Sequence, residues 1–269
     1  MSTLSVPAGF RAIGQAAHFD EAAFSLVGDS EYRTFLLVIG GTEGFSGALH
    51  GESLLCPLTP ENAHALARRF PWLIPQRIPE GKPSFGFGDR LGMATPGHVR
   101  SLSGYDVFPI FAQQSVRENE RTGRSFAEVL TDATFGVFRE GYEQGFGADA
   151  DHLKELKDAE DAANAGFTFF TCDPGDHVQE AETLTQEQLG VAFDALDHAQ
   201  GWRDRYLNRT FQIGDDLFLR FGEEELYRAA VKYGRAIEHA VGMYTGLAGL
   251  LPEGSLNCGA MYCHARDSV

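Results

Sequence analysis

Apolar and polar positions along the first 80 residues predict one strand and one helix. The stretch Tyr32–Gly40, with its apolar run FLLVI, predicts a buried strand that ends at two glycines. Thr59 is a typical N-cap, and Pro60 suits the first helical position. Four apolar residues then share one helix face before Pro71 ends the helix: Ala63, Leu66, Ala67 and Phe70.

From residue 83 onward, short apolar runs alternate with helical patterns. Strands are predicted near 85–89, 107–113, 145–150 and 166–173. Helices are predicted over 125–142 and 153–165. This alternation is typical of parallel βαβ units. Polar residues follow each strand, as they do at the carboxyl ends of barrel strands.

The predicted fold class is therefore α/β, with a partial (β/α)₈, TIM-barrel-like architecture. An N-terminal α/β extension is predicted over 1–82, the partial barrel domain over 83–250, and an irregular tail over 251–269. The end of the barrel domain is helical. Two apolar stripes there predict core packing: one at Leu184, Leu189, Ala192, Phe193 and Leu196, the other at Leu226, Ala230, Tyr233, Ile237, Val241 and Tyr244.

The charge balance disfavours several classes of partner. The 269 residues include 22 Lys and Arg against 38 Asp and Glu, which gives a formal net charge of −16. Nucleic-acid binding needs a basic face, and an anionic membrane surface attracts basic segments. We therefore expect no nucleic-acid partner and no membrane partner.

The location predicted for the protein is the cytoplasm. The first residues, MSTLSVPAGF, lack the basic and apolar regions of a secretory signal. No apolar run approaches the roughly 20 residues that a membrane-spanning helix needs. Four cysteines in a chain of this length do not indicate a disulfide framework.

Candidate chemistry gathers after the third predicted strand, at Asp149, Asp151 and His152. Strand alternation places the two aspartates on one face. A carboxylate beside an imidazole suits a general base next to a metal ligand. The alternative is that Asp151 is the N-cap of the helix that follows. The residue types leave both interpretations open.

Two further clusters follow other strands. Asp173 and His177 stand in the segment TCDPGDH, which is also typical of a Pro-Gly turn capped by aspartate. Gln113 and Arg117 follow the second strand, and an arginine there can bind a carboxylate or phosphate through its paired N–H groups. A solvated helix face explains Arg117 equally well. We consider all four as substrate-binding residues.

Four ordered blocks resemble the tagaturonate/fructuronate epimerase family: PSFGFGDRLGMATPGH over 83–98, AQQSVRE over 112–118, GADADHLK over 147–154 and DPGDH over 173–177. The resemblance covers roughly residues 83–180. It implies a (β/α)₈-type, metal-dependent enzyme that interconverts D-tagaturonate and D-fructuronate. It also implies that Asp151 is the proton acceptor and that His152 is a ligand of a divalent metal cation.

The resemblance extends to only part of the family pattern. Members continue into a C-terminal half, with the proton donor and further metal-binding histidines, that has no counterpart here. We therefore expect a truncated chain that binds a divalent metal weakly and epimerises poorly or not at all when alone. The alternatives are a metal-dependent sugar aldolase or isomerase, which would release three-carbon products, and an inactive half-barrel fragment.

Overall fold

The computed structural model describes residues 5–251 of the chain. This part divides into two compact units. The first unit runs to Thr171 and takes in the end of the described chain from Leu247, and the second unit covers Cys172–Gly246. The predicted domain 83–250 therefore contributes to both units. The predicted tail 251–269 lies outside the described residues except for its first residue.

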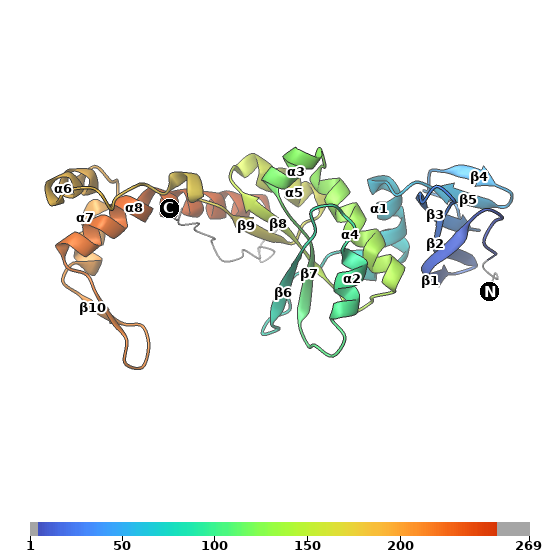
Figure 1. Cartoon of the computed structure of the whole chain (residues 1–269), viewed down its shortest axis with the longest axis horizontal. Helices are drawn as coiled ribbons and strands as arrows, with labels where there is room; N and C mark the ends of the chain where they lie inside the picture. Colours follow the sequence, from blue (N-terminus) through green and yellow to red (C-terminus); the bar gives the residue numbers. More distant parts are fainter. Residues whose placement is uncertain (1–4, 252–269) are drawn as a thin grey trace. The chain divides into compact units, whose positions relative to one another are not determined.

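The first unit begins with a five-stranded antiparallel sheet in the order β1-β2-β3-β5-β4 (Figure 1). Its strands are β1 (Arg11–Phe19), β2 (Ala22–Gly28), β3 (Thr34–Ile39), β4 (Ala48–His50) and β5 (Ser53–Cys56). The strand predicted over 32–40 is confirmed as β3. The β1–β2 hairpin carries no alternating pattern, because β2 is buried at every position and β1 is nearly everywhere exposed.

The predicted helix after Thr59 is confirmed as α1 (Pro60–Arg69). The Thr59 hydroxyl accepts a hydrogen bond from the backbone N–H of Asn62, as an N-cap does. The helix is followed directly by a short 3₁₀ turn, η1 (Pro71–Leu73). A proline cannot continue the hydrogen-bond ladder of a helix interior, so the end of α1 was predictable.

The second half of the first unit is an α/β layer built on a four-stranded sheet in the order β6-β7-β8-β9. Its strands are β6 (Ser84–Gly88), β7 (Phe108–Ser115), β8 (Gly147–Leu153) and β9 (Phe169–Cys172). The helices that alternate with them are α2 (Thr95–Ser101), α3 (Val116–Thr122), α4 (Phe126–Glu140) and α5 (Leu156–Ala165). The parallel pairing of β6 with β7 and of β7 with β8 confirms the prediction of a parallel α/β sheet.

A TIM-barrel-like architecture is not confirmed. The parallel strands that are described form one sheet of four, and the same unit also holds the separate antiparallel sheet. None of the helices within residues 5–251 is long and apolar enough to cross a membrane.

Aromatic side chains hold the helices against the parallel sheet. The fully buried ring of Phe111 on β7 stacks on His98 of α2, with centroids 6.4 Å apart, and lies 6.1 Å from the ring of Tyr142, just after α4. Helix α4 begins with a capping box, in which Ser125 and Glu128 each bond the other's backbone N–H. This start fixes which face of α4 meets β7.

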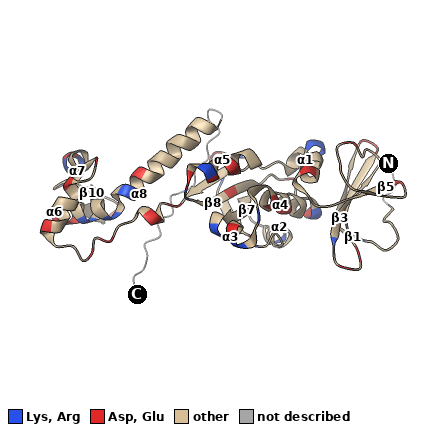
Figure 2. Cartoon of the chain, turned by 90° about the horizontal axis from the view of Figure 1, so that it is seen from above, with Lys and Arg blue, Asp and Glu red and all other residues tan. Residues whose placement is uncertain are grey.

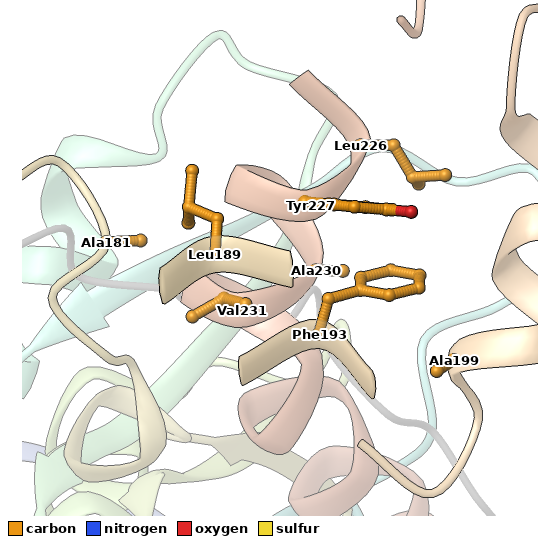
Figure 3. Packing of buried hydrophobic residues seen from close by; sticks show 8 residues of the cluster. All are labelled: Ala181, Leu189, Phe193, Ala199, Leu226, Tyr227, Ala230 and Val231. Atoms are coloured by element: carbon orange, nitrogen blue, oxygen red, sulfur yellow. The ribbon is translucent and has the colours of Figure 1, made fainter. Parts of the chain in front are cut away.

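The second unit is helical. It contains the 3₁₀ turn η2 (Gly175–His177), α6 (Gln186–Asp194), α7 (Ala199–Tyr206), the small hairpin of β10 (Thr210–Gln212) and β11 (Phe218–Arg220), and most of α8 (Glu223–Leu250). Its core lies between α6 and the start of α8 (Figure 3). There the rings of Phe193 and Tyr227 stack with centroids 4.2 Å apart.

The first predicted stripe is confirmed, since its members pack into or against this core. The second stripe is only partly a core. Leu226 and Ala230 are buried, but Ile237, Val241 and Tyr244 are 44%, 58% and 53% exposed. Burial continues along α8 on other residues, at Ala236, Ala240, Met243 and Leu247, so the predicted stripe lies on the wrong face of the helix there.

Phe193→Ala should destabilise the second unit by about 3–5 kcal/mol, because it removes a fully buried ring and leaves a cavity. Trp202 fluorescence in a Trp72→Phe background reports on this unit alone, since the sequence has two tryptophans. Val191→Ala is the matched control on the same helix, because Val191 is 70% exposed. Equal losses in the two variants during chemical denaturation would refute this description of the core.

Candidate active site

A cleft of about 330 Å³ opens at the carboxyl ends of β6, β7 and β8. Sites in α/β folds lie at this edge of the sheet. Four of the predicted site residues, Gln113, Arg117, Asp151 and His152, line this one cleft. The full lining is Gly88, Asp89, Arg90, Gln113, Gln114, Ser115, Arg117, Glu118, Asp151 and His152.

A bulge in β7 decides which side chains reach the cleft. Between Phe111 and Gln114, β7 has two residues opposite the single residue Asp149 of β8. The extra residue is Ala112, whose φ of 56° lies in the left-handed region that non-glycine residues rarely adopt. In an unbroken strand Phe111 and Gln113 would share a face. The bulge instead leaves Phe111 with the helices and turns Gln113 toward Asp149.

Asp149 is a buried carboxylate, 1% exposed, at the centre of a small polar network. Its Oδ2 accepts a hydrogen bond of 2.8 Å from Gln113 Nε2, and its carboxylate oxygens lie 3.0 and 3.1 Å from the donor hydroxyl of Thr171. Burial raises the pKa of Asp149 to about 7, and the charge of Asp151 adds to the rise. The two hydrogen bonds and His152 oppose it.

Asp151 and His152 come from the end of β8 and are half-buried. His152 Nε2 lies 3.5 Å from Asp151 Oδ2. The backbone of His152 has a φ of 56°, which non-glycine residues rarely adopt, although β8 continues to Leu153. The alternative role of Asp151 as an N-cap is wrong. Asp151 is a strand residue, and α5 begins later, at Leu156, with Glu155 in the N-cap position.

The rim of the cleft after β6 is organised by Asp89, a residue that sequence reasoning left without a role. Burial would raise the pKa of Asp89, but hydrogen bonds from three backbone N–H groups outweigh it and lower that pKa. The donors are Ala94 at 2.7 Å, Leu91 at 3.1 Å and Met93 at 3.2 Å. The neighbouring Arg90 lines the cleft from this ordered loop.

Arg117 stands on α3, which starts directly from the end of β7. Ser115 caps this helix by accepting a hydrogen bond of 3.3 Å from Glu118 N–H. The Arg117 side chain is 68% exposed, with Nε 3.8 Å from Glu118 Oε1. Acidic and basic residues are mixed along α3 (Figure 2). Arg117 is thus both on a solvated helix face and at the cleft.

Asp173 and His177 belong to the second unit. Asp173 Oδ1 accepts a hydrogen bond of 2.9 Å from Gly175 N–H, which is the capped turn that the segment also predicted. The His177 ring stacks on the His239 ring with centroids 4.1 Å apart. Substrate binding by these two residues stays a prediction.

The sequence drew attention to Asp149 only through alternation with Asp151. It could not assign the partners of Asp149, because Gln113 and Thr171 belong to two other strands, 36 and 22 residues away. The bulge at Ala112 has no sequence signal either, since glycine is the usual residue at that φ.

The residues near His152 do not fit a complete metal centre. A catalytic divalent metal usually has three protein ligands and an open position. Within the described residues, no group of three or more His, Cys, Asp and Glu side chains could hold a metal ion. A metal role for His152 therefore stays a prediction.

A family model, a characterised relative and solved structures that match this chain all belong to the same family of proteins. The model of a family described as tagaturonate epimerase matches residues 17–250. The chain is 42% identical to the tagaturonate/fructuronate epimerase of Thermotoga maritima over 242 residues, which are 87% of this chain and 50% of that protein. It is also similar to the native crystal structure of fructuronate-tagaturonate epimerase UxaE from Cohnella laeviribosi, with a TM-score of 0.77 and 32% identity.

The same UxaE protein, solved with one and with two glycerol molecules, gives the same similarity. The aligned part is 86% of this chain and 48% of the UxaE chain. These relatives are epimerases, a class of isomerases. The chain belongs to the tagaturonate epimerase family, and it spans about half the length of the relatives that it matches.

Asp149→Asn should change how the stability of the first unit depends on pH. The pKa of Asp149 is about 7 in the folded chain and near 3.8 when unfolded, so between these values only the folded chain holds the proton. This stability is fully present below about pH 4 and is lost as the pH rises through 7. From about pH 5 to pH 8 the variant should gain roughly 1–4 kcal/mol relative to the native chain.

The readout is denaturation followed by Trp72 fluorescence in a Trp202→Phe background. Asp106→Asn controls for the loss of one negative charge, because it removes an exposed carboxylate from the same unit. A stability difference between the Asp149→Asn and native chains that is independent of pH would show that Asp149 is ionised throughout.

Proposed function

We propose that the chain supplies the base and the carboxylate-binding group of an enzyme that interconverts D-tagaturonate and D-fructuronate. The observation that carries this proposal is one cleft lined by both Asp151 and Arg117, in a chain of this family. The cleft volume of about 330 Å³ is at the lower end of the range for small-molecule sites. A six-carbon sugar acid is a ligand of suitable size.

The difference between the two substrates limits the mechanism. They differ at the carbon one removed from the carbon next to the ketone. The C–H bond at that position is not acidified by the carbonyl group, so enolisation alone cannot invert it. Cleavage and re-formation of a carbon–carbon bond, as in a retro-aldol reaction, can.

In this mechanism Asp151 takes the proton from the hydroxyl on the carbon to be inverted. The bond to the carbon next to the ketone breaks, and its electron pair stays on the ketone fragment as an enolate. The other fragment becomes an aldehyde and rotates. Re-formation of the bond and return of the proton from Asp151 give the epimer. The carboxylate stays on the aldehyde fragment, and Arg117 holds it through charge-assisted hydrogen bonds, which keeps this fragment in the site while its aldehyde group turns.

His152 remains the proposed ligand of a divalent metal, as the resemblance implies. A metal ion would stabilise the enolate as a Lewis acid. Since the described residues do not form a complete ligand set, the proton transfer and carboxylate binding above are assigned to the chain's own side chains. The predicted cytoplasmic location likewise stays a proposal.

The test is conversion of tagaturonate to fructuronate by the purified chain, with and without added Mn²⁺, Zn²⁺, Co²⁺ or Ni²⁺. We expect slow conversion, and a loss of about 100-fold in Asp151→Asn, because a general base contributes 10²–10⁴-fold. Arg117→Ala should raise KM more than it lowers kcat. Asp161→Asn, on the exposed face of α5, is the matched control.

Equal conversion by the native and Asp151→Asn chains would contradict the role of Asp151. Accumulation of three-carbon products would favour the aldolase alternative. If the chain neither converts nor binds either hexuronate, the alternative of an inactive fragment is correct.

A further inference from the structure

The proposed reaction leaves Asp149 without a role, although it is the most deeply buried carboxylate beside the cleft. Burying a carboxylate costs free energy unless it is well hydrogen-bonded. Asp149 meets this requirement with Gln113 on β7 and Thr171 on β9, so it links the two strands that flank β8. All three side chains belong to the first unit.

The network fixes the orientation of the Gln113 side chain. Its Nε2 donates to Asp149 Oδ2 at 2.8 Å, so the carboxamide must present its other atom, Oε1, elsewhere. Oε1 is not among the buried, unpartnered side-chain atoms of the described chain. Gln113 itself lines the cleft. Its carbonyl oxygen is therefore the acceptor that the Gln113 side chain can offer to a ligand.

Gly86 leaves the space that this orientation needs. A Cβ atom at Gly86 would lie 2.6 Å from Gln113 Oε1 and 2.9 Å from Nε2, closer than real Cβ atoms approach. A Cβ at Gly88, by contrast, would meet nothing nearer than the Gln113 backbone oxygen at 4.0 Å. The Gln113 carboxamide thus packs directly over Gly86, whereas the position of Gly88 is open.

We propose that Asp149 is a positioning residue, which holds Gln113 so that Oε1 accepts a hydrogen bond from a substrate hydroxyl. This inference rests on the proposed function and names the part of the substrate that the subsite recognises. An acceptor oxygen binds a hydroxyl and repels a carboxylate. A hexuronate would therefore place a hydroxyl at Gln113 and its carboxylate at Arg117. A site of this kind rejects an analogue that lacks the hydroxyl.

The positioning role can be tested without any substrate. The side-chain amide of Gln113 is observed by NMR in protein labelled with ¹⁵N-glutamine and assigned by its loss in Gln113→Ala. Asp149→Ala should move this signal to the position of a free glutamine, and the conservative Asp149→Asn should leave it near its native position. A signal that is unchanged in Asp149→Ala would overturn the role of Asp149.

The hydroxyl subsite is tested by calorimetric titration with tagaturonate. Asp149→Ala and Gln113→Ala should each weaken binding about tenfold, and the double variant should bind no more weakly than Gln113→Ala alone. Gly86→Ala should also weaken binding, whereas Gly97→Ala on α2, where an added Cβ would meet nothing within 4 Å, should not. Thr134→Ala, which changes a buried hydroxyl of α4, controls for general destabilisation.

Additive losses in the double variant would contradict a path through Gln113. A native chain that binds no tagaturonate would refute both the proposed function and the hydroxyl subsite, while the amide spectrum would still decide the positioning role. The titration and the amide spectrum therefore distinguish a failure of the proposed function from a failure of the positioning role.

Discussion

The extra residue at Ala112 is the constraint on which the cleft depends. It lets Phe111 remain in the aromatic core against the helices while the next side chain, Gln113, turns to the opposite face and meets Asp149. Gln114 then returns to the helix side, where Arg124 donates to its amide oxygen and pairs with Asp132 on α4. A backbone conformation that alanine rarely adopts is thus maintained by contacts on both faces of the sheet.

The bulge thus brings Gln113 of β7 and the buried Asp149 of β8 together on one face of the sheet. Asp149 is held in a place where its charge is poorly solvated, and its raised pKa reports this. Poor solvation of an ionisable side chain is typical of sites that fix side chains in advance of ligand binding. Asp151, two residues further along β8, faces the cleft and is only half-buried. One strand therefore carries two carboxylates in different environments: Asp149 is buried and hydrogen-bonded, and Asp151 lines the cleft.

The sequence was sufficient for features that depend on local chemistry. Thr59 with Pro60 and Ser125 with Glu128 mark helix starts, and the apolar runs mark the four parallel strands. The sequence was insufficient where hydrogen-bond partners are distant along the chain, as for Asp149 with Thr171. It was also insufficient where the residue type does not indicate the backbone conformation, as for the positive φ of Ala112. The β1–β2 hairpin was not predicted, because neither strand alternates. The α8 stripe was wrong in its second half, because the apolar period did not show that the helix buries Ala236 and Ala240 rather than the larger residues beside them.

Two findings support the proposed binding of a hexuronate at the carboxyl ends of β6, β7 and β8. They are the membership of the tagaturonate epimerase family and the geometry of the cleft. A crystal structure of the chain with bound tagaturonate tests this claim most directly. We expect the substrate carboxylate within hydrogen-bond distance of Arg117, one hydroxyl on Asp151 and another on Gln113 Oε1. Electron density for the sugar acid elsewhere, with the cleft filled by water alone, would contradict it.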